Sequence, residues 1–135
     1  SVLFGAIGAL CYWFPKVTGR FLDEFQGKVA FWLVFIGTNV TFLSMFISGL
    51  RGMPRRYSSY SSIFAHTNLI STVGAYVIMA GMLVLLGAII TSWKKGVPSG
   101  PNPWSANSLE WQVPTPVPLE NFEVLPVITQ DPYHY

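Results

Sequence analysis

The sequence Gly52-Met53-Pro54-Arg55-Arg56 separates two long stretches that contain no charged residue, 29–50 and 57–93. A helix that crosses a bilayer needs about 20 mostly apolar residues, so each stretch is long enough to provide one. A soluble chain of 135 residues has room to bury one such helix at most. The two stretches therefore predict an all-α membrane protein in which a short arginine loop joins two spanning helices.

The composition agrees with this prediction and excludes several other classes of protein. Charged residues make up 10% of the chain, against about a quarter in ordinary soluble domains. The net charge of +2 is too small to indicate nucleic-acid binding. The single cysteine, Cys11, excludes a disulfide framework and a cysteine-based zinc site.

The first fourteen residues are apolar and lead into Tyr12-Trp13-Phe14-Pro15, a typical exit from a membrane. Fourteen residues are too few to span a bilayer. The stretch also lacks the initial Met and the basic segment of a signal peptide. We expect 1–14 to be the second half of a spanning helix whose first half lies on upstream sequence.

Eight of the ten prolines fall between Pro98 and Pro132, which indicates an extended, irregular tail rather than a further domain. The predicted order is a half helix, an inner connection, a spanning helix, an outer arginine loop, a second spanning helix and an extended inner tail, over 1–14, 15–27, 28–50, 51–62, 63–93 and 94–135.

The orientation follows from the positive residues near the ends of the spans. Five lie at the connection and the start of the tail, and three lie in the loop: Lys16, Arg20, Lys28, Lys94 and Lys95 against Arg51, Arg55 and Arg56. The larger group predicts that the tail is on the cytoplasmic or matrix side. The loop then carries its arginines on the side that the rule disfavours, which indicates that a ligand holds them there.

Arg55 and Arg56 have the chemistry to bind that ligand, because guanidinium groups bind carboxylates and phosphates with paired donors. The six acidic residues of the chain lie far from the loop in sequence. The alternative is that both side chains reach lipid headgroups. Pro54 stiffens the backbone before them and favours a specific anion, on a cofactor or on another chain.

Both predicted helices carry a stripe at helical spacing that is rich in small and hydroxylated residues. In the first helix it is Gly37, Thr41, Ser44 and Ser48, and in the second it is Asn68, Thr72, Ala75, Met79 and Met82, with Ser71, Gly74 and Gly81 beside them. Such stripes indicate close helix packing, with hydroxyls bonded to the preceding turn. They also suit a surface that accommodates a bulky planar group. The residues alone leave both interpretations open.

The chain lacks a set of residues able to catalyse a reaction by itself. Its two histidines, His66 and His134, have no Cys or carboxylate partner at ligand spacing. There is no glycine-rich phosphate loop, serine nucleophile or carboxylate pair. We therefore expect no catalytic residue and no metal ligand in this chain.

Several strings occur in a specific order along the chain: Trp13-Phe14-Pro15, Phe35-Ile36-Gly37-Thr38-Asn39-Val40-Thr41-Phe42, Gly49-Leu50-Arg51-Gly52-Met53-Pro54-Arg55-Arg56-Tyr57-Ser58, Asn68-Leu69-Ile70-Ser71-Thr72-Val73-Gly74, Ser108-Leu109-Glu110-Trp111 and Asn121-Phe122. Together they resemble subunit I of the haem–copper terminal oxidases of the cytochrome c oxidase type. Two places depart from the usual pattern of that family. Leu43-Ser44-Met45-Phe46 replaces a common Phe-Pro-Gln-His, and Ser58-Ser59-Tyr60-Ser61-Ser62 lacks a common Asp and Pro.

The resemblance implies that the chain holds the C-terminal helices of a twelve-helix subunit, namely the end of the tenth, the eleventh and the twelfth. It implies that Arg55 and Arg56 meet the propionates of two haems, and that Thr41 and Phe42 pack along the low-spin haem. The family's copper and haem-iron ligands would then lie on the upstream part of the subunit, so this chain would hold no metal.

The resemblance also implies a respiratory enzyme that couples electron transfer from cytochrome c to the reduction of oxygen to water and pumps protons. Its partners would be the rest of subunit I, a copper-bearing subunit II and the bilayer. The tail, with Pro101-Asn102-Pro103-Trp104, is similar to bacterial forms and favours the bacterial cytoplasmic membrane over the mitochondrial inner membrane. Two alternatives remain: a quinol oxidase of the same superfamily, and a small structural or assembly subunit that binds no haem.

Overall fold

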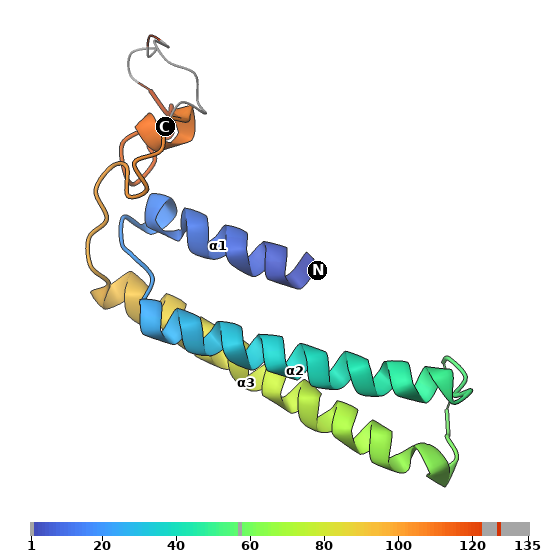
Figure 1. Cartoon of the computed structure of the whole chain (residues 1–135). Helices are drawn as coiled ribbons and strands as arrows, with labels where there is room; N and C mark the ends of the chain where they lie inside the picture. The colour runs from blue at the N-terminus through green and yellow to red at the C-terminus, as the bar shows by residue number, and fades with distance from the viewer. Residues whose placement is uncertain (1, 57, 123–126, 128–135) are drawn as a thin grey trace. The chain divides into compact units, whose positions relative to one another are not determined.

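The computed structural model describes residues 2–56, 58–122 and 127. In that part of the chain the regular structure is helical: α1 (Val2–Thr18), α2 (Glu24–Leu50), the short 3-10 helix η1 (Ser62–Phe64), α3 (Ala65–Lys95) and α4 (Leu109–Gln112) (Figure 1). The chain divides into two compact units, Glu24–Ala88 and the described residues of Ser1–Asp23 with Ile89–Tyr135.

The unit Glu24–Ala88 is a helical hairpin in which α2 and α3 lie side by side (Figure 1). Glycines let the two backbones come close. A Cβ atom on Gly37 would lie 2.8 Å from the carbonyl oxygen of Gly74, and one on Gly81 would lie 2.8 Å from Cγ2 of Val34. Any larger residue at these positions would force the helices apart.

A row of hydroxyl groups runs along the same interface. Ser44 Oγ lies 2.6 Å from Ser71 Oγ, and Ser48 Oγ donates a 2.7 Å hydrogen bond to Thr67 Oγ1. Ser44 Oγ also bonds to the Val40 carbonyl one turn earlier. For Gly37, Ser44 and Ser48 the structure therefore supports helix packing.

The stripe read on the second helix does not form the contact with α2. Met79 is 53% exposed, and Thr72, Ala75 and Met82 are exposed as well. Asn68 is the one partly buried member of the stripe. The buried face of α3 instead carries Gly74, Gly81, Leu85 and Ala88. The sequence placed Ser71, Gly74 and Gly81 beside the stripe, and these three residues do contact α2. The stripe itself lies to one side of the contact, because apolar residues surround α3 and leave little periodicity.

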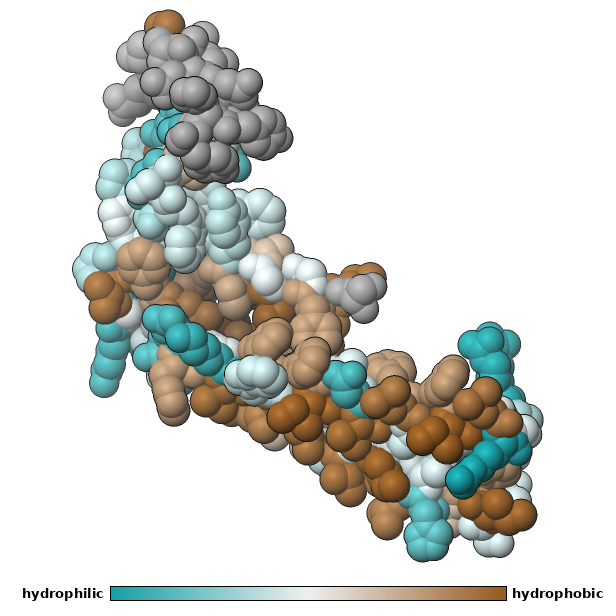
Figure 2. All heavy atoms as spheres, in the orientation of Figure 1, coloured by the Kyte–Doolittle hydropathy of each residue, from teal (hydrophilic) through white to brown (hydrophobic). Residues whose placement is uncertain are grey.

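Helices α2 and α3 expose most of their apolar side chains. Two helical segments among the described residues, Glu24–Leu50 and Ser62–Lys95, are long and apolar enough to cross a membrane. Figure 2 shows apolar residues gathered over the shaft of the hairpin and hydrophilic residues at its loop end. This distribution suits a hairpin surrounded by lipid or by further apolar helices.

Several boundaries differ from those expected. Helix α2 begins at Glu24 rather than at 28. The Glu24 carboxylate in the first turn suits the helix dipole and forms a 2.7 Å ion pair with Lys28. Helix α1 continues through Pro15 to Thr18 instead of ending at 14. Gly19, at φ 72°, then closes it by donating to the Pro15 carbonyl.

The tail is less extended than expected, because it contains α4 and packs against the end of α1. Trp111 of α4 is fully buried. Backbone hydrogen bonds of 2.8 Å join Phe21 N–H to the Val97 carbonyl and Ser99 N–H to the Gly19 carbonyl. Burial of this large aromatic ring and the backbone hydrogen bonds together hold the segment despite its prolines.

Candidate functional site

The arginine loop begins where α2 is closed by a glycine. Gly52 takes a φ of 87°, a conformation that suits glycine, and its N–H donates to the Gly49 carbonyl. Met53 N–H donates to the Ser48 carbonyl at 3.1 Å. The chain therefore leaves the helix sharply, and Arg51, Arg55 and Arg56 come to lie on one short loop.

Arg55 and Arg56 are exposed and have no partner among the residues that the structure describes. Among the described residues the one ion pair joins Lys28 to Glu24, and no hydrogen bond reaches either guanidinium group. Arg56 also has a φ of 56°, in the left-handed region that costs a non-glycine residue about 1 kcal/mol. Within residues 2–56, 58–122 and 127, the loop therefore presents two cations whose guanidinium donors have no partner.

Thr41 and Phe42 are neighbours on α2 but lie on different faces of it. Thr41 packs on α3, where its Oγ1 lies 3.4 Å from the Ser71 carbonyl and it touches the position of Gly74. Phe42 is 61% exposed. The structure thus separates the two residues that the sequence paired, and only Phe42 offers a ring to an external group.

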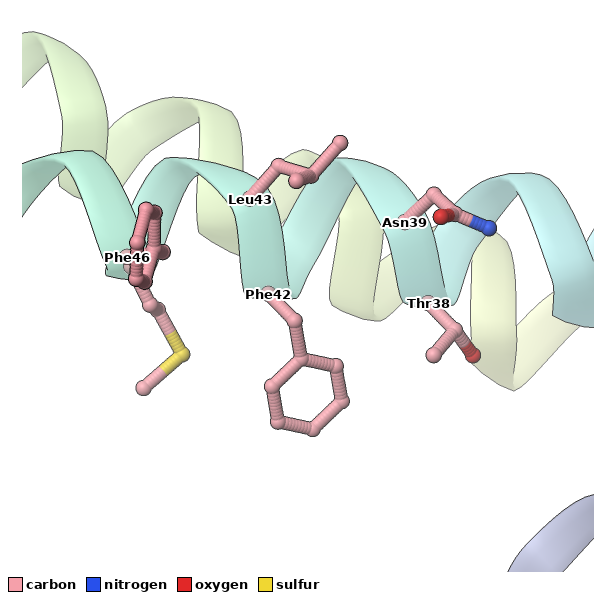
Figure 3. Close-up of a pocket in the computed structure, with 6 residues that line it drawn as sticks. Thr38, Asn39, Phe42, Leu43 and Phe46 are labelled. Atoms are coloured by element: carbon pink, nitrogen blue, oxygen red, sulfur yellow. The ribbon is translucent and has the colours of Figure 1, made fainter. Parts of the chain in front are cut away.

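Phe42 lines a shallow hollow that belongs entirely to α2 (Figure 3). Thr38 projects to the same side of the helix as Phe42, one turn away (Figure 3). The hydroxyl oxygen of Thr38 is buried and has no hydrogen-bond partner among the described residues. The lining is mainly apolar and is formed by Thr38, Asn39, Phe42, Leu43, Met45 and Phe46.

Sequence reasoning did not single out Thr38, although a signal was present. Thr38 stands four residues before Phe42, so the two share a helix face. Both residues also line the hollow on α2. Thr38 therefore joins Phe42 as a candidate contact residue.

No metal centre is formed by the described residues, since no three His, Cys, Asp or Glu side chains come together in them. His66 is exposed at the start of α3. His134 and Tyr57 lie outside the described residues. The chemical groups that this part of the chain does offer are the two free guanidinium groups and the hollow on α2.

The helical hairpin with its two apolar helices and arginine loop suits a membrane protein, as judged from the described residues. The family model described as cytochrome c and quinol oxidase polypeptide I matches residues 1–77. The chain belongs to this family, as its sequence strings predicted.

Curated relatives match along nearly the whole chain. Cytochrome c oxidase subunit 1 of Thermostichus vulcanus is 49% identical over 133 residues, which is 98% of this chain and 24% of the relative. The same subunit of Synechocystis sp. is 42% identical over 98% of this chain and 24% of the relative. A probable cytochrome c oxidase subunit 1-beta of Nocardia farcinica is 38% identical over 97% of this chain and 23% of the relative. The chain spans about a quarter of the length of these relatives.

Proposed function

We propose that this chain is the C-terminal part of subunit I of a cytochrome c oxidase, comprising the last three of twelve membrane helices and an inner tail. In this role it belongs to an enzyme that passes electrons from cytochrome c to oxygen, forms water and pumps protons. The observation that carries the proposal is the pair of free, exposed guanidinium groups on a loop that joins two apolar helices.

Arg55 and Arg56 bind the propionate groups of two haems. The fit rests on their charge and on the absence of any carboxylate partner for them in the described part of the chain. A cation within about 4–6 Å lowers a carboxyl pKa by about 1–3 units, which keeps a propionate ionised in an apolar environment. The haems supply the redox chemistry when bound. The arginines hold the charge of their propionates and stabilise the reduced state of the iron.

Phe42 packs along the low-spin haem, because its exposed ring borders a mainly apolar hollow. Thr38 lies on the same side of α2 and lines the hollow beside Phe42 (Figure 3). Thr41 contributes less directly. It closes α2 onto α3 and so sets the position from which Phe42 projects.

The remaining ligands and partners come from outside this chain. The copper and haem-iron ligands lie on the upstream part of subunit I, and a copper-bearing subunit II receives electrons from cytochrome c. The protein resides in the bacterial cytoplasmic membrane, or otherwise in the mitochondrial inner membrane. Five positive residues at the connection and the start of the tail put the tail on the cytoplasmic or matrix side.

Quinol is the second candidate electron donor, since the matching family includes quinol oxidases. Cytochrome c is favoured because the curated relatives described above are cytochrome c oxidases by name. An independent small subunit without haem is not carried further, because the chain belongs to the subunit I family.

The experiment is to purify the membrane complex that contains this chain and to measure its reduced-minus-oxidised spectrum and its oxygen consumption. We expect haem absorbance changes and oxygen uptake with reduced cytochrome c. Uptake with quinol alone would replace the donor. A complex without haem absorbance would overturn the proposal.

A further inference from the structure

A buried lysine lies in the unit formed by the described residues of Ser1–Asp23 and Ile89–Tyr135. Lys16 is 4% exposed, near the end of α1. Its Nζ donates hydrogen bonds to the carbonyl oxygens of Pro101, at 3.1 Å, and of Val113. An ammonium group loses much free energy on leaving water unless its donors are bonded. Both bonds go to the tail, so the burial of Lys16 depends on the tail.

Trp111 completes the environment of this lysine. The ring is fully buried, and Nζ of Lys16 lies 5.6 Å from its centroid, close enough for a cation–π interaction. The ring also meets Tyr12 edge to face at 5.1 Å. Two carbonyl groups and one aromatic face therefore surround the ammonium, and all three come from residues 101–113.

Further hydrogen bonds join the same tail segment to the chain around the end of α1. Ser99 Oγ bonds to the Pro15 carbonyl at 3.2 Å, and the Trp104 indole N–H donates to the Tyr12 carbonyl at 3.1 Å. The Arg20 guanidinium donates to the Gly96 carbonyl at 2.9 Å. We refer to residues 96–113 as the strap.

These contacts differ in what their loss would cost. A hydrogen bond between neutral groups contributes little net free energy at a surface, because water replaces it when it opens. Loss of the Lys16 donors removes the side-chain donor of the Val113 carbonyl and leaves the Pro101 carbonyl with the bond from Thr115 Oγ1 alone, at 3.2 Å. It also removes the cation from a fully buried ring. Lys16 is therefore the contact on which the docked strap depends most.

We propose that the strap is a conformational latch, in which Lys16 inserts between the Pro101 and Val113 carbonyls and Trp111 covers it, so that one side chain locks the tail to the end of α1. The latch also holds the last turns of α3 beside the connection that follows α1, where Asp23 N–H donates to Ser92 Oγ at 2.9 Å. It uses none of the residues of the proposed haem contacts, so either proposal can fail without the other.

Hydrogen–deuterium exchange on the complete membrane complex tests the latch. The reporters are the amides of Phe21 and Ser99, which donate to the Val97 and Gly19 carbonyls and not to Lys16. Both bonds join the strap to the connection that follows α1. Lys16→Met should raise their exchange rates by about tenfold or more. The matched control is Lys28→Met, which removes a lysine that is 69% exposed, and should leave them unchanged. Equal rates in the two variants would overturn the proposal.

A double-mutant cycle separates one latch from two independent contacts. Trp111→Phe should also raise exchange at Phe21 and Ser99. In the double variant with Lys16→Met, the fold-increase in exchange rate should be smaller than the product of the two single fold-increases, because both changes release the same contact. A full product would show that the contacts act separately and would contradict a single latch.

A measurement on the unmodified complex covers the case in which Lys16→Met does not accumulate. Acylation by a water-soluble amine-reactive ester, read by mass spectrometry, should modify Lys16 about tenfold or more slowly than Lys28. Equal rates of modification would mean that Lys16 is not buried in the complex and would overturn the latch.

Discussion

The arginine loop and the end of α1 both concentrate positive charge next to apolar helices, but they treat it in opposite ways. Lys16 is buried, and the chain's own carbonyl groups and an indole ring surround it. Arg55 and Arg56 are exposed, and none of the described residues pairs with them. A cation that its own chain satisfies stabilises the fold. A cation that its chain leaves free is available to a ligand, and this contrast separates structure from function in the chain.

The largest expected effect is on the buried cation. Lys16→Ala should weaken strap docking by about 2–3 kcal/mol, because hydrogen bonds from a charged donor are lost inside the protein. Lys28→Ala removes an exposed ion pair and should cost less than about 1 kcal/mol. Amide exchange of Ser99 measures both values. If the two substitutions cost the same, burial would not distinguish these cations.

The next effect concerns the free cations. Arg55→Gln or Arg56→Gln should lower the midpoint potential of the haem it contacts, since the added charge of the oxidised iron is then less opposed. Coulomb's law with an effective dielectric of about 20 gives ~2 kcal/mol at about 8 Å, on the order of 90 mV for one electron. Spectroelectrochemical titration measures the shift, with Lys28→Gln as control. Unchanged potentials and full pumping in both arginine variants would contradict the propionate role and favour the alternative that the pair contacts lipid headgroups.

A smaller effect is expected from pH. Burial lowers the pKa of Lys16, and the charge of Glu110 acts against that shift. Between this lowered pKa and the usual lysine pKa, the docked strap binds fewer protons than the released strap, so docking should strengthen as pH rises. Amide exchange of Ser99, corrected for intrinsic rates, tests the slope, which should vanish in Lys16→Met. A slope of the opposite sign would show that the contacts of the ammonium outweigh its burial.

The smallest effect is expected from Arg55→Lys. The charge is kept, so the haem potential should shift by less than in Arg55→Gln, while the paired donors of the guanidinium group are lost. Proton pumping per electron should fall more than the potential shifts. A potential shift as large as that of the Gln variant would mean that donor geometry, rather than charge, is what the loop contributes.

Much of the hairpin could be predicted because a membrane-spanning helix is recognisable from the composition of one continuous stretch of sequence. Two uncharged stretches indicated the two helices, and the charged loop between them indicated the residues that would bind an anion. The family was also recognised from strings in the sequence and is confirmed. The roles of Arg55, Arg56, Thr41 and Phe42 stay predictions, because they concern groups that another part of the protein supplies.

The misses arose where distant residues decide the structure. Lys16 was counted only as a topology signal, since nothing near it in sequence indicates that its acceptors lie 85 and 97 residues further on. Helix α1 continues past Pro15 because Gly19 closes it, a detail of backbone conformation. The packing face of α3 was located only in part, through Ser71, Gly74 and Gly81, because an almost uniformly apolar helix has weak periodicity.

The distance in sequence between Lys16 and its acceptors also has a consequence for the order in which the protein matures. A ribosome completes α1, α2 and α3 before it reaches Pro101 and Val113, so the amine of Lys16 stays in water while all three long helices already exist. The latch therefore forms only after the three long helices have been synthesised. Nascent chains halted before residue 101 should carry an amine at Lys16 that reagents modify as fast as that of Lys28, and the protection should arise only once the strap has been synthesised.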